Sequence, residues 1–197
     1  MSNPFTIAII YGSVREGRQG IRAARFLEAQ CKSRGWQVTL LDPLELKLPL
    51  LAKRYRDFSP GTAPEPLDQL SRILADADAY IVVSAEYNHA LPPALTNLLD
   101  YFKGEFSRKP CACVTYSAGS FGGVRVTAQL RSLLGELGMV SLPAMMPIPS
   151  VQDQFDENGS PHDADAWDRR AKTLLDELAW YAEALKAQRA KNDPADA

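Results

Sequence analysis

Short, continuous apolar segments alternate along this chain with segments whose apolar residues recur every three or four positions. The continuous segments are rich in β-branched residues, which is typical of strands buried in a parallel sheet. The second pattern is typical of amphipathic helices. We therefore predict strands at residues 5–11, 36–41, 79–84, 111–117 and 140–144. Helices are predicted at residues 20–34, 67–77, 92–102, 126–137 and 167–185.

Two regions of the chain do not fit this alternation. Residues 42–65 are mixed and contain four prolines, so we expect a long excursion with one short helical turn near residues 52–58. A loop of this length in a compact domain is usually functional or contacts a partner. Residues 147–161 are predicted to form a polar loop.

Five strands alternating with five helices predict a parallel sheet covered by helices on both faces. The strand order 2-1-3-4-5 would place strands 1, 3 and 4 side by side. We expect a single domain over residues 1–190 and a frayed tail over residues 191–197. Because ligands bind in such folds at the carboxyl ends of the strands, the loops after strands 1, 3 and 4 should line one crevice.

Composition limits the functions that the chain can have. Its 197 residues are 46% hydrophobic, and its formal net charge of −2 argues against nucleic acid as the main partner. The sequence has no apolar run of 18 residues, so no membrane-spanning helix is expected. The start of the chain does not have the pattern of a signal peptide, and the three cysteines make an odd count. We therefore expect a cytoplasmic protein with reduced thiols.

The loop after the first strand has the chemistry of a phosphate site. Glycines at positions 12, 17 and 20 allow a tight turn and a close approach of the backbone to a ligand. The start of the following helix offers unpaired N–H groups, which favour an anion. Ser13 can add a hydroxyl, and Arg15 and Arg18 can add charge-assisted hydrogen bonds. The alternative is that the glycines only form a turn and the arginines are solvated.

Two familiar phosphate motifs are incomplete in this loop. Gly12 and Gly17 have the spacing of the Walker motif, but Arg18 stands in place of its lysine and Gln19 in place of its Ser or Thr. Without that hydroxyl, hydrolysis of a nucleoside triphosphate is not favoured. The dinucleotide pattern of three glycines is also absent. Asp42 could bind a ribose, although a turn residue before Pro43 is the simpler interpretation.

The loop after the third strand places four polar side chains before the Pro92-Pro93 helix start. Asn88 can donate to and accept from a ribityl chain or a ring edge, and Tyr87 could border a planar ring. Glu86 could shape the turn, and both Glu86 and Asn88 could instead cap the next helix. His89 is a weak catalytic signal, because His162 is the only other histidine and no metal or triad pattern forms.

The loop after the fourth strand is rich in glycine. Its exposed N–H groups could bind ring carbonyls, and its small residues would let a flat ring lie close to the segment Ser117, Ala118, Gly119, Ser120, Phe121, Gly122 and Gly123. A nucleophilic serine is not favoured, because the G-x-S-x-G pattern is absent. Cys111 and Cys113 should share one face of a buried strand and behave as small hydrophobic residues.

Taken together, the three loops resemble the NAD(P)H-dependent FMN reductase family, a flavodoxin-like group that includes quinone, chromate and azo-dye reductases. The resemblance covers most of residues 5–140. It rests on Gly12-Ser13-x-Arg15, on Glu86-Tyr87-Asn88 with Pro92 and Leu95-x-Asn97-x-x-Asp100-Tyr101, and on Ser117-x-Gly119-x-x-Gly122-Gly123. It implies a flavodoxin-like three-layer sandwich with a five-stranded parallel sheet.

The resemblance also implies a cofactor, its ligands and a reaction. FMN would place its phosphate at Ser13, Arg15, Arg18, Gln19, Gly20 and Ile21. Its ring and ribityl chain would lie against Glu86, Tyr87, Asn88, His89 and the segment from Ser117 to Gly122. NADPH or NADH would be the co-substrate, a quinone-like molecule the acceptor, and the order of reaction ping-pong. No catalytic side chain and no metal are implied, and relatives are commonly homodimers or homotetramers.

The sequence departs from the family pattern at several positions. Arg18 stands where Ser is frequent, Ala85 where Pro is frequent, and Pro93 where Gly is common. Two alternative functions also stay open. The first is a flavodoxin-like FMN-binding or regulatory protein without significant turnover, and the second is a nucleotide-binding enzyme that uses the incomplete Walker motif.

Overall fold

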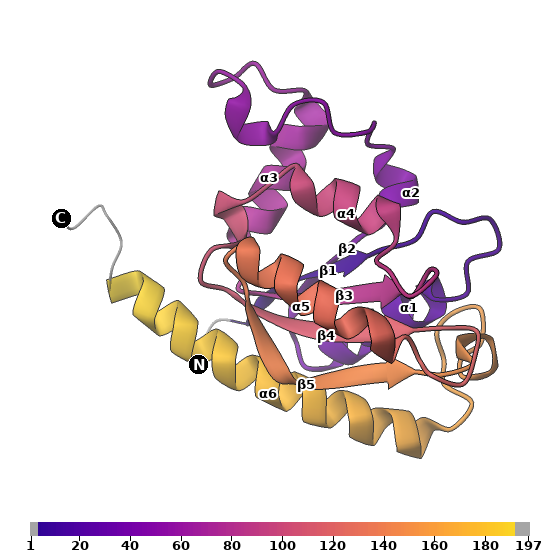
Figure 1. The fold of residues 1–197 in the computed structure, drawn as a ribbon. Helices are drawn as coiled ribbons and strands as arrows, with labels where there is room; N and C mark the ends of the chain where they lie inside the picture. Colours follow the sequence, from indigo (N-terminus) through magenta and orange to yellow (C-terminus); the bar gives the residue numbers. More distant parts are fainter. Residues whose placement is uncertain (1–3, 192–197) are drawn as a thin grey trace.

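The computed structural model describes residues 4–191 of the chain. Its middle layer is a five-stranded parallel sheet in the predicted order, β2-β1-β3-β4-β5 (Figure 1). The strands alternate with helices along the chain, as the apolar pattern predicts. They are β1 (Thr6–Tyr11), β2 (Gln37–Leu41), β3 (Ala79–Ala85), β4 (Pro110–Tyr116) and β5 (Val140–Ile148).

Helices cover both faces of the sheet. On one face, the side chains of Ile9, Ile81 and Val114 pack against α1 (Ile21–Ser33) and α6 (Ala164–Lys191). On the other face, alternate residues of the same strands pack against α3 (Glu65–Asp76), α4 (Pro93–Asp100) and α5 (Thr127–Glu136). The two faces therefore form two separate cores, and β1, β3 and β4 are buried on both sides.

The fifth strand is longer than predicted. It continues past Ala144 to Ile148, although it contains Pro143 and Pro147. Both prolines are tolerated because β5 lies at the edge of the sheet. Its register with β4 also slips, so that Cys111 pairs with Ser141 but Cys113 pairs with Met145. The predicted start of the polar loop at residue 147 is therefore wrong, because β5 continues to Ile148.

The side chain of Arg131 closes this bulge in β5. From α5, its Nη2 donates to the carbonyl oxygens of Leu142 at 2.8 Å and Pro143 at 2.7 Å. The extra residues of the bulge cannot give these carbonyls a ladder partner on β4. An arginine on the preceding helix thus satisfies backbone groups that the irregular strand leaves free.

The excursion over residues 42–65 contains two short helices. Helix α2 (Pro43–Leu46) was not predicted, whereas the turn η1 (Tyr55–Asp57) falls within the predicted residues 52–58. The excursion is held against α4 by the side chain of Asn97, which accepts from the Leu51 N–H and donates to the Pro49 carbonyl, both at 2.8 Å. The hydroxyl of Tyr101 donates to the same carbonyl at 3.1 Å.

The three cysteines are free thiols, and each is fully buried. Cys111 and Cys113 lie on the same face of β4, as predicted, within the core beneath α3, α4 and α5. Burial raises the pKa of the Cys31 thiol to about 12. Within residues 4–191, no helix is both long and apolar enough to cross a bilayer.

Candidate functional site

The three predicted loops come together at the carboxyl ends of β1, β3 and β4 (Figure 1). They form a cleft of about 260 Å³. Half of the predicted site residues line it: Ser13, Arg15, Arg18, Gln19, Glu86, Tyr87, Ser117 and Ala118. The predicted residues that do not line it adjoin it in sequence: Gly20, Ile21, Asn88, His89, Gly119, Ser120, Phe121 and Gly122. Gly17, one of the glycines expected to let the backbone approach a ligand, also lines the cleft. Residues that sequence reasoning missed are Glu16, Ala85, Tyr116 and Val151.

Ser13 is the point where the first loop meets the second. Its side chain is only 1% exposed, and its Oγ lies 2.5 Å from the phenolic oxygen of Tyr87. The same Oγ accepts a hydrogen bond from the Arg15 N–H at 3.3 Å. Ser13 therefore fixes the shape of the first loop, and its hydroxyl already has two partners.

The two arginines of the first loop lie in different surroundings. Arg15 is exposed, and its guanidinium carbon lies 5.3 Å from the centre of the Tyr87 ring. Within residues 4–191, no carboxylate pairs with it. The guanidinium of Arg18 forms two hydrogen bonds of 2.5 Å with the carboxylate of Asp42. Arg15 is therefore available to an anion in the cleft, whereas Arg18 is paired.

The start of α1 supplies backbone donors to the cleft. No side chain caps this helix, whose N-cap residue is Gly20. The described residues offer no acceptor to the N–H groups of Ile21 and Ala23, whereas the N–H of Arg22 bonds to the Gln19 carbonyl. The side chain of Gln19 donates to the Gly17 carbonyl at 2.9 Å. Free N–H groups at a helix N-terminus, with Arg15 nearby, match the chemistry of a phosphate ligand.

A pair of buried tyrosines supports this loop from beneath. The rings of Tyr11 and Tyr116 are stacked with their centres 6.2 Å apart, and their hydroxyl oxygens lie 2.9 Å apart. Burial raises the pKa of both phenols. A Cβ atom added to Gly20 would lie 2.0 Å from the Tyr116 ring. Glycine at position 20 therefore lets α1 begin directly against Tyr116.

The second loop is a tight turn between two hydrogen bonds. The N–H and carbonyl groups of Tyr87 and Ala90 bond reciprocally at 3.0 and 2.9 Å. Asn88 and His89 between them have φ angles of 52° and 62°. Asparagine tolerates this left-handed conformation better than most residues. The residue at the N-cap of α4 is Pro92, with no side-chain cap, so the alternative that Asn88 caps this helix is wrong.

Glu86 joins the second loop to the third. Its side chain is 7% exposed, and its two oxygens accept from the backbone N–H of Arg125 at 3.1 Å and from Nη1 of Arg125 at 3.3 Å. Arg125 belongs to η3 (Val124–Val126), so Glu86 serves a helix start 39 residues away rather than that of α4. The alternative that Glu86 caps the next helix is therefore also wrong.

The third loop is shaped by two glycines that face the protein. Gly122 and Gly123 have φ angles of 62° and 75°. A Cβ atom on Gly122 would lie 3.0 Å from the backbone nitrogen of Ile148, and one on Gly123 would lie 2.8 Å from the carbonyl oxygen of Tyr116. Gly122 thus forms the turn and lies outside the cleft lining. Ala118, Gly119 and Ser120 are exposed, and of these three Ala118 lines the cleft.

An exposed aromatic ring lies at the end of the third loop. Phe121 is 59% exposed, and the guanidinium carbon of Arg125 lies 3.9 Å from its ring centre. The Glu86 carboxylate holds the same guanidinium. This edge of the site therefore presents a fixed cation and a flat apolar surface side by side.

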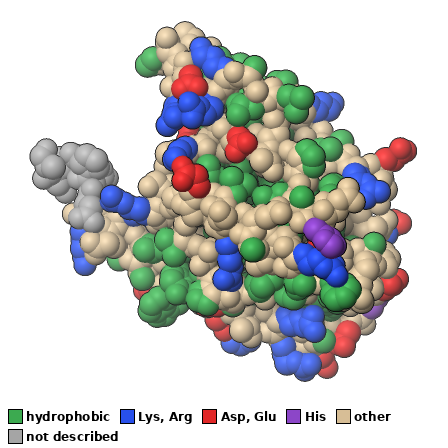
Figure 2. All heavy atoms as spheres, viewed as in Figure 1, with side chains coloured by type: hydrophobic (Ala, Val, Ile, Leu, Met, Phe, Trp, Pro, Cys, Tyr) green, Lys and Arg blue, Asp and Glu red, His purple; other side chains and the backbone are tan. Residues whose placement is uncertain are grey.

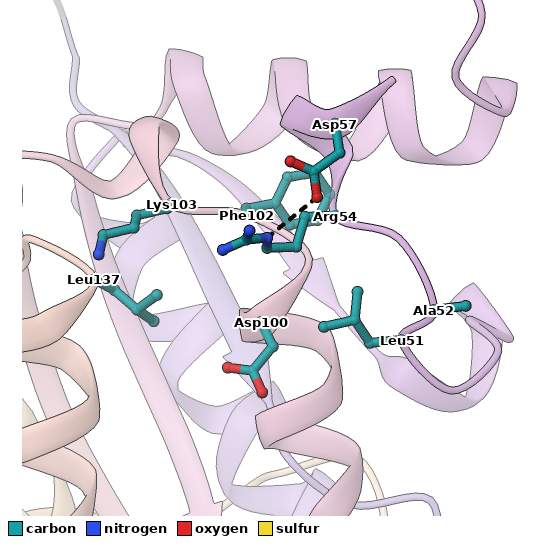
Figure 3. Close-up of a pocket in the computed structure, with 8 residues that line it drawn as sticks. All are labelled: Leu51, Ala52, Arg54, Asp57, Asp100, Phe102, Lys103 and Leu137. Atoms are coloured by element: carbon teal, nitrogen blue, oxygen red, sulfur yellow. Dashed lines mark hydrogen bonds and ion pairs between the residues drawn. The ribbon is translucent and has the colours of Figure 1, made fainter. Parts of the chain in front are cut away.

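A larger cavity lies elsewhere in the molecule and shares no residue with the cleft. It measures about 540 Å³ and separates the excursion from the carboxyl ends of α4 and α5 (Figure 3). Figure 2 shows acidic and basic side chains around an apolar floor on this face. Arg54 is paired there with Asp57 at 3.2 Å, and burial raises the pKa of Asp100. No loop from the carboxyl ends of β1, β3 or β4 reaches this cavity, so size alone does not identify the site.

Across the described part of the chain, no group of three or more His, Cys, Asp or Glu side chains is placed to hold a metal ion. His89 is exposed on the second loop and bonds through its backbone carbonyl to Gln129 at 3.3 Å. As far as the structure describes the chain, the cleft offers hydrogen-bond donors, the exposed guanidinium of Arg15 and the rings of Tyr87 and Tyr116.

Comparison with known proteins gives a consistent family. The sequence model of the NADPH-dependent FMN reductases matches residues 5–153. The chain is 29% identical over 173 residues to a quinone reductase of Pseudomonas putida, an alignment that covers 83% of this chain and 88% of that protein. It is 28% identical over 163 residues to an NAD(P)H-dependent FMN reductase of a Nectria species, covering 76% and 78% of the two chains.

Solved structures have the same fold. The flavoenzyme FerB of Paracoccus denitrificans, an NAD(P)H:(acceptor) oxidoreductase, superposes with a TM-score of 0.72 at 22% identity, covering 91% of this chain and 98% of that one. A flavodoxin of Pseudomonas aeruginosa superposes with a TM-score of 0.53 at 19% identity, covering 86% and 99%. The predicted flavodoxin-like sandwich is therefore confirmed.

Proposed function

The chain belongs to the NADPH-dependent FMN reductase family, and from this premise we propose that it holds FMN in the cleft and passes two electrons from NADH or NADPH to a quinone-type acceptor. Membership makes the protein an oxidoreductase. The cofactor, the acceptor and the order of the reaction are the proposal. The observation that carries it is the convergence of the three loops in one cleft with phosphate chemistry on one side and aromatic and backbone groups on the other.

The donor set of the cleft fits FMN. The free N–H groups at the start of α1 and the exposed guanidinium of Arg15 would hold the phosphate. Tyr87 and the segment from Ser117 to Ser120 would hold the ring and its ribityl chain, with Asn88 and His89 at the edge of the second loop. When bound, FMN supplies the redox chemistry by accepting a hydride from a nicotinamide and giving two electrons to an acceptor.

The side chains and backbone of the cleft would position FMN and its substrates; they would not react themselves. Ala118 and Gly119 are exposed, and their N–H groups would donate hydrogen bonds to ring oxygens and stabilise negative charge there. Glu86 holds the second and third loops together through its hydrogen bonds with Arg125. Both substrates are flat and would use the same open side of the cleft in turn, which is why we propose a ping-pong order.

Visible spectroscopy tests the cofactor first. The purified protein is mixed with FMN and desalted, and its spectrum is then recorded. Retained absorption at about 370 and 450 nm, where flavins absorb, would support the proposal. Bleaching of these bands by NADH or NADPH under anaerobic conditions would support it further. A colourless protein would contradict it. Initial rates at several fixed acceptor concentrations test the order, since a ping-pong reaction gives parallel double-reciprocal lines and a ternary complex gives intersecting ones.

We further propose that the protein forms a homodimer or homotetramer beside the cleft. An apolar groove of about 250 Å³ lies between the first loop, the excursion and the start of α4. It is lined by Val14, Pro43, Leu48, Leu50, Pro93, Ala94, Asn97 and Leu98. Leu50 is 84% exposed, and burying such a side chain against a second copy removes apolar area from water.

Light scattering during size-exclusion chromatography tests the oligomer. The wild-type protein should elute as a dimer or tetramer, and Leu50→Asp should shift it towards the monomer. Trp180→Asp is a matched control, since Trp180 is also exposed but lies on α6 away from this groove. A monomeric wild-type protein, or an equal shift in both variants, would contradict this surface.

A further inference from the structure

We propose that Arg18 is not a ligand of the phosphate but forms, with Asp42, a positioning pair that fixes the first loop for FMN. This inference rests on the proposed function of the cleft. The family resemblance places a phosphate contact at Arg18, and its position in the loop supports the same expectation. In the structure, however, the guanidinium of Arg18 lies against the carboxylate of Asp42, 24 residues away, and nothing in the local sequence predicts this contact.

The contact between Arg18 and Asp42 is bidentate. Nη1 and Nη2 of Arg18 each lie 2.5 Å from one carboxylate oxygen of Asp42, and the two side chains are 13% and 12% exposed. Nη1 also donates to the Ser13 carbonyl at 2.8 Å. The guanidinium carbon lies 5.3 Å from the centre of the Tyr11 ring. Arg18 is thus held by a carboxylate, a carbonyl and an aromatic face at once.

Moving Arg18 to a phosphate would leave Asp42 as an unpaired carboxylate that is almost buried. Breaking a buried ion pair costs more free energy than one charge-assisted hydrogen bond to a ligand returns. Arg15 has no such restraint, because it is exposed and none of the carboxylates that the structure describes pairs with it. Both arginines line the cleft, but they take different roles: Arg15 is available to the phosphate, whereas Arg18 is engaged by Asp42.

The pair connects three elements of the site. Asp42 follows β2 directly, and its Oδ1 also accepts from the Leu44 N–H at 3.0 Å as the N-cap of α2. Through the Ser13 carbonyl, Arg18 sets the path of the loop between β1 and α1. Fixing this path before the ligand arrives reduces the entropy lost on binding and aims the free N–H groups at the phosphate.

The two roles of Arg18 predict opposite effects for Asp42→Asn. If Arg18 were a phosphate ligand, weakening its partner would free it, and FMN would bind equally well or more tightly. A positioning pair predicts at least a tenfold weaker affinity for FMN, measured by flavin fluorescence quenching. The affinity for riboflavin, which has no phosphate, should change much less, because the pair acts on the phosphate loop. A general loss of stability would weaken both ligands alike.

Two further variants complete the comparison. Arg15→Ala should weaken FMN binding and make it less sensitive to salt, because a direct charge contact is lost. Asp57→Asn removes an exposed carboxylate that is paired with Arg54, and it should leave both affinities unchanged. Unchanged or tighter FMN binding by Asp42→Asn, with normal binding by the wild type, would overturn the positioning role.

A crystal structure of the wild-type protein with FMN decides the question if Asp42→Asn does not fold. Arg18 should keep both hydrogen bonds to Asp42, with no phosphate oxygen within about 3.5 Å of its guanidinium nitrogens. A phosphate contact by Arg18, with Asp42 released, would overturn the inference and leave the proposed function intact. A wild-type protein that binds no FMN would instead contradict the proposed function itself.

Discussion

At the scale of single residues, Gly20 has the least freedom in the first loop. It directly precedes α1 and lies against the ring of Tyr116. The ring fits there because Gly20 has no Cβ atom. Its φ angle of −65° is open to any residue, so its need for glycine is entirely steric. This differs from Gly17, whose φ of 66° favours glycine although the space around it is open.

We predict that Gly20→Ala destabilises the protein by about 2 kcal/mol or more, because the added methyl group overlaps a packed ring. Gly135→Ala is the matched control. Gly135 lies within α5 and an added Cβ there meets nothing within 4 Å, so alanine should stabilise the fold by about 0.5–1 kcal/mol. Urea unfolding followed by circular dichroism measures both. Equal effects of the two substitutions would contradict the packing argument.

Lys109 is a second residue whose environment has a measurable consequence. It is 7% exposed, and its ammonium group donates to two carbonyls in the last turn of α3, those of Leu74 and Ala75. Burial, followed by the nearby charge of Arg189, lowers its pKa from 10.5 to about 8. The folded protein therefore releases this proton at a lower pH than the unfolded chain does.

The lowered pKa of Lys109 predicts a rise in stability with pH. Between about pH 8 and 10.5 the unfolded chain binds more protons at this site, so the free energy of unfolding increases as the pH rises through this window. Relative to Lys109→Met, the wild type should gain about 2 kcal/mol between pH 7 and 10. Urea unfolding at several pH values measures the difference, with Lys47→Met as the exposed control. A difference that does not change with pH would refute the prediction.

At the scale of elements, α4 has two functions. Its buried face packs Leu95, Leu98 and Leu99 into the core, and its outer side holds the excursion through Asn97. In the family motif, Leu95 thus packs into the core, and Asn97 and Tyr101 hold the excursion. The amide of Asn97 is matched to one N–H and one carbonyl of the excursion, a pairing that needs both a donor and an acceptor.

We predict that Asn97→Ala destabilises the protein by about 1–2 kcal/mol and exposes the excursion to proteases. Asn97→Asp should have an intermediate effect, because a carboxylate still accepts from the Leu51 N–H but cannot donate to the Pro49 carbonyl. Limited proteolysis with mapping of the cut sites, together with urea unfolding, measures both. Cleavage outside residues 42–65, or identical behaviour of the two variants, would show that Asn97 does not hold this segment.

The same elements show what the sequence can predict. Apolar periodicity predicted every strand and the long helices, because burial on one or both faces leaves a local signal. It missed α2, which has only four residues and no buried side chain, and it ended β5 at Ala144, four residues too early. The pairings Arg18–Asp42 and Glu86–Arg125 were also missed. Each joins residues far apart in the chain, and a charged residue does not reveal its partner in the local pattern.

At the scale of the whole molecule, the strand order brings the site together. Adjacent positions for β1, β3 and β4 gather loops that are separated by up to about a hundred residues in sequence. That order was predictable, because the alternation of strands and helices allows few parallel topologies. The residues beneath the loops, such as Tyr11 and Tyr116, were not, because a buried aromatic residue in a strand carries no sign of what lies above it.

A ligand that ties three loops together should raise the stability of the whole fold. With FMN at about 100 times its Kd, linkage adds about 2.7 kcal/mol, which for a chain of this size corresponds to a rise in Tm of about 5–10 °C. Riboflavin at the same concentration should give a smaller rise, since it has no phosphate for Arg15 and the start of α1. Thermal unfolding followed by circular dichroism tests this. An equal rise with both flavins would argue against the phosphate site.

The burial of all three cysteines has a chemical consequence for an enzyme that would handle quinones. Quinones are electrophiles that form covalent adducts with thiolates by conjugate addition, and thiolates react only where they are accessible. Cys31, Cys111 and Cys113 each have essentially no exposed surface in the folded chain. The fold therefore presents no thiol to an electrophile in solution, and the protein should keep its activity in the presence of acceptors that alkylate and inactivate proteins with exposed cysteines.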